Sequence, residues 1–264
     1  MLKISGICKV FNKGTINEKQ ALRGVDLHLK PGEFVTVIGG NGAGKSTLLN
    51  SIAGVYGVED GKIEIDGVDV THLPEYRRAK FIGRVFQDPM MGTAATMQIE
   101  ENMALAARRG KFRSLMPGIT AKERAEYKEQ LKILGLGLED RLTAKVGLLS
   151  GGQRQALTLL MATMKQPKLL LLDEHTAALD PKTAAKVLEV TEKVVAKNNL
   201  TTLMITHNMR DAIAYGDRLI MMYDGKIVVD VSGPEKKKLT VEQLLDLFSR
   251  ASGSDEADDK LLLS

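Results

Sequence analysis

Gly39-Gly40-Asn41-Gly42-Ala43-Gly44-Lys45-Ser46-Thr47 is a glycine-rich stretch with the pattern G-x-x-x-x-G-K-[ST]. The β-branched and aromatic run 33–38 precedes it and predicts a buried strand, and residues 46–53 after it predict a helix. The glycines allow positive φ angles, so that successive backbone N–H groups can approach phosphate oxygens. The order of strand, loop and helix therefore predicts a phosphate-binding loop.

Two side chains of this loop suit a nucleoside triphosphate. Lys45 adds a full positive charge that can reach the β- and γ-phosphates, next to the positive end of the following helix dipole. Ser46 offers a hydroxyl to Mg²⁺, a hard cation that prefers oxygen ligands and bridges the phosphates. The other loop residues expected to bind the nucleotide are Gly39, Asn41, Gly42, Ala43, Gly44 and Thr47.

Two acids follow a second apolar run. Residues 168–172 predict a strand that is buried on both faces, and Asp173 and Glu174 come directly after it. Asp173 suits a Mg²⁺ contact, and Glu174 suits a base that polarises an attacking water molecule. Two carboxylates after a strand can also be plain loop residues, but a phosphate loop in the same chain favours the catalytic interpretation.

The loop alone allows a GTPase, a kinase or a recombinase-like ATPase. No Asn-Lys-x-Asp motif for guanine selection follows it. The downstream string Leu149-Ser150-Gly151-Gly152-Gln153 can be a turn and helix start with Ser150 as N-cap. Its spacing also resembles the signature of the ATP-binding cassette (ABC) family. The resemblance implies that Ser150, Gly151, Gly152 and Gln153 contact ATP held by another copy of the protein.

Other motifs resemble those of the same family, in the same order. Val85-Phe86-Gln87-Asp88 resembles its Q-loop, which implies that Gln87 contacts Mg²⁺ and the attacking water. Ala178-Leu179-Asp180 resembles the D-loop. Ile205-Thr206-His207 resembles the motif whose histidine contacts the γ-phosphate. The resemblance spans roughly residues 2–235 and implies an ATP-hydrolysing enzyme.

Two positions of the motifs leave alternatives open. Phe11 occupies the place of the family's adenine-stacking aromatic residue, which is more commonly tyrosine, or it is a core residue at the end of the first strand. His175 stands where many family members have proline. It either forms a hydrogen bond near the seam between two cassettes, tunes Glu174, or is a tolerated loop residue without a role.

The chain is expected to have an α/β fold. The resemblance implies a P-loop NTPase (RecA-like) core with a parallel sheet, an antiparallel β-subdomain and an inserted α-helical subdomain. We expect one ABC ATPase domain over residues 1–250, with core and β-subdomain in 1–87 and 165–250 and the helical subdomain in 88–164. The patterns predict helices over 99–109, 121–134, 153–164 and 181–197, strands over 201–205 and 218–223, and a frayed tail or docking segment over 251–264.

Composition sets broad limits. The chain of 264 residues has a net charge of +4, which indicates no particular partner, and its basic runs 108–111 and 236–238 are expected to be solvated faces. They can also lie near anionic lipid headgroups. The single cysteine, Cys8, excludes an internal disulfide and fits a reducing compartment. No apolar stretch approaches the ~20 residues that a bilayer span needs.

The resemblance implies an assembly around ATP and Mg²⁺. Two cassettes, expected to be identical, would pack head to tail at the cytoplasmic face of the plasma membrane, beneath separate permease subunits and an extracytoplasmic substrate-binding protein. Met90 and Met91 lie where importers of the family receive a permease helix, and residues 86–94 resemble a subgroup for the uptake of amino acids such as the aromatic ones. The alternatives are a cassette for export, lipid handling or mechanical signalling. A soluble ABC ATPase acting on nucleic acid or ribosomes is disfavoured, because no coiled coil interrupts the motifs and no second cassette follows.

Overall fold

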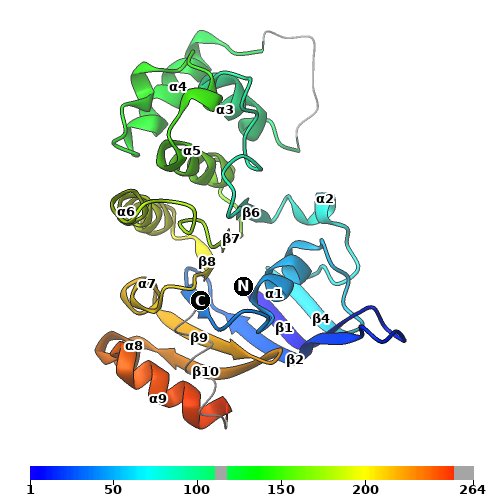
Figure 1. Cartoon of the computed structure of the whole chain (residues 1–264). Coiled ribbons are helices and arrows are strands. Elements are labelled where there is room, and N and C mark those ends of the chain that lie inside the picture. Colours follow the sequence, from blue (N-terminus) through cyan, green and yellow to red (C-terminus); the bar gives the residue numbers. More distant parts are fainter. Residues whose placement is uncertain (111–117, 253–264) are drawn as a thin grey trace.

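The computed structural model describes residues 1–110 and 118–252, which form two β-sheets with helices around them (Figure 1). One sheet has six strands in the order β10-β9-β3-β8-β7-β6, and the other has four in the order β2-β1-β4-β5. The strands are β1 Leu2–Phe11, β2 Lys19–Leu29, β3 Phe34–Ile38, β4 Asp60–Ile65, β5 Val68–Asp69, β6 Ile82–Val85, β7 Leu169–Asp173, β8 Thr201–Ile205, β9 Arg218–Tyr223 and β10 Lys226–Ser232.

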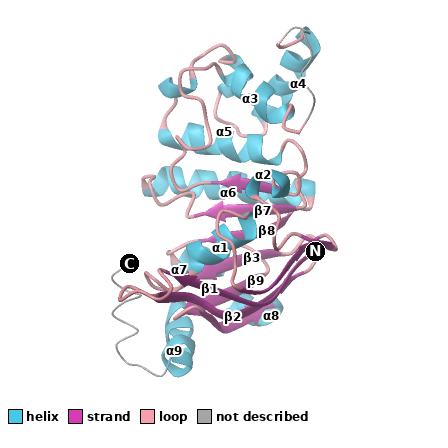
Figure 2. Cartoon of the chain, turned by 90° about the vertical axis from the view of Figure 1, so that its right-hand side faces the viewer, coloured by secondary structure: helices cyan, strands magenta, loops and turns pink. Residues whose placement is uncertain are grey.

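The six-stranded sheet is parallel except for its edge strand β10, which pairs antiparallel with β9. Every residue of β3 and β8 is buried, as in β7 up to Leu172, because helices cover the sheet on its faces (Figure 2). The predicted parallel sheet is thus confirmed. The register places Asp173 of β7 opposite Ile205 of β8, so that the acidic turn and the segment with His207 leave the sheet side by side.

The four-stranded sheet is antiparallel, as the alternation in residues 2–29 predicts. Its buried side chains, such as Leu2, Ile4 and Leu27, share one apolar core with the phosphate-loop helix α1 and with β3. Burial on one face explains the alternating pattern of β1 and β2, whereas the strands of the other sheet are continuous apolar runs.

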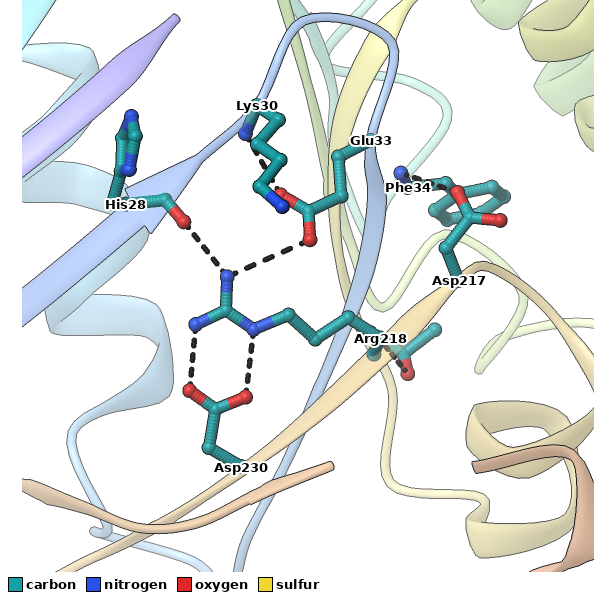
Figure 3. Close-up of polar contacts among 8 residues, drawn as sticks. His28, Lys30, Glu33, Phe34, Asp217, Arg218 and Asp230 are labelled. Atoms are coloured by element: carbon teal, nitrogen blue, oxygen red, sulfur yellow. Dashed lines mark hydrogen bonds and ion pairs between the residues drawn. The ribbon is translucent and has the colours of Figure 1, made fainter. Parts of the chain in front are cut away.

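Arg218 ties the beginning of β9 to the neighbouring strands (Figure 3). Its Nε and Nη2 donate to the two carboxylate oxygens of Asp230 on β10, at 2.7 and 2.6 Å. Nη1 donates to the carbonyl of His28 in β2 at 2.7 Å and lies 3.6 Å from a carboxylate oxygen of Glu33. A planar guanidinium with five N–H donors can serve all of these acceptors at once, and it thereby joins the two sheets.

The five predicted helices are present as α1, α3, α4, α5 and α6, with shifts at their ends, whereas α2, α7, α8 and α9 were not predicted. The helices are α1 Lys45–Ala53, α2 Glu75–Arg78, α3 Ile99–Ala107, α4 Ala121–Lys132, α5 Gly151–Thr163, α6 Pro181–Asn198, α7 Met209–Ala214, α8 Gly233–Lys238 and α9 Val241–Ser252, with 3-10 turns at Leu138–Asp140 and Val146–Leu148. α3 and α4 end before Gly110 and Gly135, whose φ angles are positive. α5 begins at Gly151 because Ser150 is its N-cap.

α3, α4 and α5 gather at one end of the molecule, beyond α6 and far from the four-stranded sheet (Figure 1). Their apolar side chains, such as Met103, Leu131 and Leu157, form one core with β7, β8 and α6. This is the region in which the inserted helical subdomain was expected.

The C-terminal part corrects two expectations. α9 continues to Ser252, past the start of the predicted tail, and residues 253–264 lie outside the described part, as does Lys111 of the first basic run. In the second basic run, Lys236 is 1% exposed and donates to the carbonyls of Tyr215 and Gly216 at the end of α7. Burial lowers the pKa of Lys236 to about 8, and Asp217 partly offsets this. This lysine therefore caps a helix end rather than facing solvent.

Within residues 1–110 and 118–252, no helix has the length and apolar character that a bilayer crossing requires.

Candidate functional site

The phosphate loop connects β3 to α1, as predicted. Gly39 leaves β3 with a φ of 148°, and a Cβ at this position would lie 2.2 Å from the carbonyl oxygen of Met222 on the neighbouring strand β9. Only glycine permits this approach. The loop therefore lies close against the end of the parallel sheet, and the N-terminus of α1 points into the space above it.

A cavity of about 220 Å³ lies over this loop. It brings together most residues that the sequence motifs single out for the nucleotide. Its lining comprises Phe11, Lys19, Ala21, Asn41, Gly42, Ala43, Gly44, Lys45, Ser46, Thr47 and Glu174. The cavity therefore joins an aromatic ring from the four-stranded sheet, a phosphate loop and the carboxylate of Glu174, which directly follows β7.

Phe11 is only partly buried, at the end of β1, and it forms an edge-to-face contact with Tyr56 at 5.2 Å between ring centroids. The ring thus lies at the wall of the cavity instead of in the apolar core. This position suits the stacking of a flat base.

Lys45 is 7% exposed, and its ammonium donates to the carbonyls of Gly39 at 2.6 Å and Gly40 at 3.3 Å. Burial lowers the pKa of Lys45, while the carboxylates of Glu174 and Asp173 partly offset this. The cation is held inside its own loop, where phosphate oxygens can become acceptors in place of the two carbonyls.

Glu174 leaves β7 with a φ of 43°, in the left-handed region that costs a non-glycine residue about 1–3 kcal/mol. Its backbone N–H donates to the carbonyl of Ile205 at 3.1 Å, and its Oε2 lies 3.6 Å from Nδ1 of His207. The turn directs this carboxylate into the cavity over the phosphate loop. Such strain at a polar site is common where function fixes the side chain.

Asp173 lies beside the cavity and does not line it. Its Oδ2 is 3.5 Å from Nη2 of Arg84 on β6, which also donates to Asn50 of α1 at 2.7 Å. Burial raises the pKa of Asp173, and the charge of Arg84 partly offsets this. Gln87 is exposed two residues beyond β6, and His207 is also exposed, so neither belongs to the lining of this cavity.

The signature residues lie apart from the phosphate loop of the same chain. Ser150 caps α5: its hydroxyl accepts from the N–H of Gln153 at 3.3 Å, and the Gln153 side chain accepts from the N–H of Ser150 at 3.2 Å. Ser150, Gly152 and Gln153 line a separate cavity of about 410 Å³ between α5 and α6, which shares no residue with the first.

Gly152 has a packing role that the sequence motif does not reveal. A Cβ here would lie 2.1 Å from Cγ2 of Thr183, at the start of α6. The glycine therefore lets the N-terminus of α5 approach α6 closely. Gly151 and Ser150 remain exposed, so the capped helix end can still meet a ligand from outside.

The surroundings of His175 contradict its interpretation as a loop residue without a role. Its side chain is 2% exposed, and its Nε2 lies 3.0 Å from Oγ1 of Thr191 within α6. Burial lowers the pKa of His175 to about 4. The residue is part of the packed interior directly behind Glu174.

Lys19 is a cavity residue that no motif singled out. It begins β2, lines the cavity, and places its ammonium 3.4 Å from the Cβ position of Gly42. No acceptor for this ammonium lies within the described residues. A lysine on a half-exposed strand carries no sequence signal of its own, because the hairpin between β1 and β2 alone brings it to the loop.

Replacing Lys19 with methionine should weaken ATP binding by about twofold to fivefold, since a solvent-screened charge pair contributes about 1 kcal/mol or less. The turnover rate at saturating ATP should stay unchanged. Titration with a fluorescent ATP analogue at two salt concentrations measures this, and the difference should shrink at high salt. Lys13→Met, in the same hairpin, is the control. Equal affinities of Lys19→Met and the parental protein would contradict the placement.

The fold and the phosphate loop define a nucleotide-binding protein of the P-loop class. A family model described as "ABC transporter" matches residues 22–177. The chain belongs to this ATP-binding cassette family and is an ATP-hydrolysing enzyme of it.

Individual relatives agree with this assignment. The tyrosine transport ATP-binding protein of Clostridioides difficile is 45% identical over 251 residues, which cover 95% of this chain and 100% of that protein. The methionine import ATP-binding protein MetN of Corynebacterium diphtheriae is 36% identical over 86% of this chain and 64% of its own length. The dimeric post-hydrolysis structure of the ATP-binding cassette MJ0796, bound to ADP and Pi, superposes with a TM-score of 0.74 at 31% identity and covers 88% of this chain and 98% of that one.

Proposed function

We propose that this chain is the ATPase subunit of an importer for a small solute such as an amino acid, and that it works as a head-to-tail pair at the cytoplasmic face of the plasma membrane. One observation carries the proposal of a pair. The chain has a phosphate cavity and a capped signature helix that line separate spaces. Each nucleotide site is therefore complete only when a second copy supplies its signature.

The geometry supports hydrolysis by in-line attack of water on the γ-phosphorus. Glu174, which reaches into the cavity, orients the water and accepts its proton. Lys45 and the N-terminus of α1 stabilise charge on the phosphate oxygens, and His207 lies 3.6 Å from Glu174 on the same side. Ser150 of the partner subunit, with the N–H groups beside it, closes the phosphate shell. Positioning and charge thus supply most of the catalysis.

The residues present fit a Mg²⁺ ion. Ser46 is exposed and lines the cavity. Asp173 lies beside the cavity, and among the described residues Arg84 is the one cation paired with its carboxylate. Mg²⁺ is usually held by one or two carboxylates together with water and substrate phosphates, and not by a cage of protein ligands. Ser46, Asp173 and Gln87 would therefore hold it, and the ion would neutralise charge on the transferring phosphate.

Ser150 offers a direct test of the shared site. Ser150→Asp keeps a good N-cap but places a negative charge against the partner's γ-phosphate, and such like-charge contacts cost several kcal/mol. The dimer formed with a non-hydrolysable ATP analogue should be lost, as measured by sedimentation velocity, while the monomer binds ATP normally. Ser150→Asn, which caps equally well without charge, is the matched control. A Ser150→Asp protein that dimerises like the Ser150→Asn protein would exclude the shared site.

The permease contact is proposed at the exposed methionines after Gln87. Met90 and Met91 are 48% and 69% exposed, and Arg154 of α5 contacts both Met90 and the carbonyl of Gly147, next to the 72% exposed Leu148. Flexible apolar side chains suit an adaptable docking surface. Arg154 connects this surface to α5, the helix that begins at the signature residues. Coupling of transport to ATP hydrolysis requires such a connection.

Replacing Met90 and Met91 with glutamate should abolish ATP-dependent uptake, because buried charges at a docking surface cost about 2 kcal/mol or more. ATP binding and the melting temperature should not change. Uptake of radiolabelled tyrosine, with methionine as competitor, is measured in cells that carry the chain with its membrane partners. Val68→Glu, another exposed apolar position, is the control. Uptake at the parental rate would place the permease contact elsewhere, and failure of the parental protein to drive tyrosine uptake would reject tyrosine as the imported solute.

A further inference from the structure

His175 is a buried histidine that the proposed hydrolysis does not use. It lies one residue after Glu174, in the turn that leads to α6, and its Nε2 is 3.0 Å from Oγ1 of Thr191. Both side chains are almost fully buried, at 2% and 1% exposure. Polar groups this deep are normally paired, and this contact fastens the middle of the turn to the middle of α6.

The direction of the hydrogen bond follows from the other partner of the hydroxyl. Oγ1 of Thr191 donates to the carbonyl of Val187, 2.8 Å away, as threonine hydroxyls inside helices commonly do. A hydroxyl has one hydrogen, so a Thr191 hydroxyl that donates to Val187 accepts from the histidine. Nε2 of His175 is therefore the N–H donor, and the neutral ring carries its hydrogen on that atom.

Glu174 depends on such an anchor because of its backbone. Its φ of 43° is a conformation that residues with a side chain rarely adopt. The N–H of Glu174 donates to Ile205, and its carbonyl accepts from the N–H of Ala177 at 3.0 Å. These bonds hold the peptide groups before and after Glu174. Whether the turn keeps the positive φ of Glu174 then depends on the next residue, His175. A proline there would restrict its own φ through its ring, whereas a histidine has no such restriction.

We propose that the hydrogen bond from His175 to Thr191 is a positioning contact that keeps the Glu174 carboxylate aimed into the phosphate cavity. The inference rests on the role proposed above for Glu174. The ring of His175 fills the space behind the turn, and its anchor on α6 replaces the restraint that its own backbone lacks. Loss of the anchor lets the turn leave the left-handed conformation, and the carboxylate then moves away from the attacking water.

The test uses the full chain and three isosteric or conservative changes. Thr191→Val removes the acceptor without changing the shape, and Thr191→Ser restores a hydroxyl. Thr163→Val removes another buried hydroxyl, whose hydrogen-bond partners among the described residues are carbonyls of its own helix α5. Thr191→Val should lower kcat about tenfold, because small misplacements of a reacting group cost one to two orders of magnitude. KM for ATP should stay within about twofold for all variants, and Thr191→Ser and Thr163→Val should keep the parental kcat within about twofold.

Each outcome decides between the inference and its alternatives. A Thr191→Val protein with the parental kcat would overturn the positioning role. So would a loss of kcat that is matched by an equal loss of ATP binding and fully explained by a smaller fraction of folded protein. Glu174→Gln, measured in the same assay, separates the two proposals. If that variant is inactive and Thr191→Val is fully active, only the inference fails, and if Glu174→Gln is as active as the parent, the proposed base fails as well.

The tautomer supplies a readout that does not depend on activity. Long-range ¹H–¹⁵N spectra of the full chain should show the His175 hydrogen on Nε2, with the signal assigned from its absence in His175→Gln. A hydrogen on Nδ1 would reverse the hydrogen bond and overturn the anchor. His175→Gln should also keep more activity than His175→Phe, because only the glutamine amide can donate to Thr191.

Discussion

Replacing Glu174 with glutamine should lower ATP hydrolysis by about 10²–10⁴-fold, the usual contribution of a general base. Glutamine keeps the size and polarity of the side chain but cannot accept the proton of the attacking water. ATP binding should be retained, because the phosphate loop and Lys45 are untouched. The protein should therefore accumulate as an ATP-loaded dimer, since opening follows hydrolysis.

Phosphate release and light scattering after size exclusion measure the two effects in one sample. Glu192→Gln on α6, an exposed carboxylate away from the cavity, is the control and should behave like the parental protein. Hydrolysis by Glu174→Gln at the parental rate would remove Glu174 from the mechanism. A variant that is inactive but stays monomeric with ATP at high concentration would instead contradict the head-to-tail pair.

Replacing Arg78 with methionine should lower the free energy of unfolding by about 3 kcal/mol or more. Arg78 is 2% exposed, and its guanidinium donates to four carbonyls, those of Ser51, Ile52, Thr71 and Leu73, at 2.7 to 2.9 Å. Two of them belong to the end of α1. Methionine fills much of the volume but donates no hydrogen bond. The carbonyl of Ser51 keeps the N–H of Gly54 as a donor, whereas those of Ile52, Thr71 and Leu73 lose the guanidinium, and a buried acceptor left without a donor costs about 1–3 kcal/mol.

Thermal unfolding with and without ATP measures this effect, and the midpoint should fall by about 6 °C or more. Affinity for ATP should fall as well, because α1 begins at Lys45 in the phosphate loop. Arg77→Met changes the adjacent, exposed arginine and should shift stability by no more than about 0.5 kcal/mol. If the two variants unfold at the same temperature, the buried guanidinium does not stabilise α1.

Local sequence patterns were sufficient for much of the fold. The apolar runs of β3, β7 and β8 are fully buried strands because their lengths and compositions allow little else between turns. Ser150 is the N-cap of α5 because a hydroxyl followed three residues later by glutamine satisfies two N–H groups at once. The helix ends shifted by one or two residues, since the apolar period of a helix does not define its terminal residues.

Other features depend on contacts between distant segments. The basic run 236–238 resembles a solvated face, but Lys236 is buried because its ammonium reaches the carbonyls that end α7. Lys19 reaches the phosphate loop only because β2 pairs with β1 and passes beside α1. His175 is buried only because α6 folds back beneath its turn.

The order of residues along the chain was enough to establish the phosphate loop, the acidic strand end and the family, because each depends on backbone geometry that neighbouring residues impose. The meeting of Phe11, Lys45 and Glu174 around one cavity, and the separation of Ser150 from it, required the packing of two sheets and of α5 against α6. These distances depend on contacts between side chains that are more than a hundred positions apart in the sequence. A local sequence pattern contains no information about such contacts. The same packing buries His175 and gives Glu174 its strained, inward-facing turn.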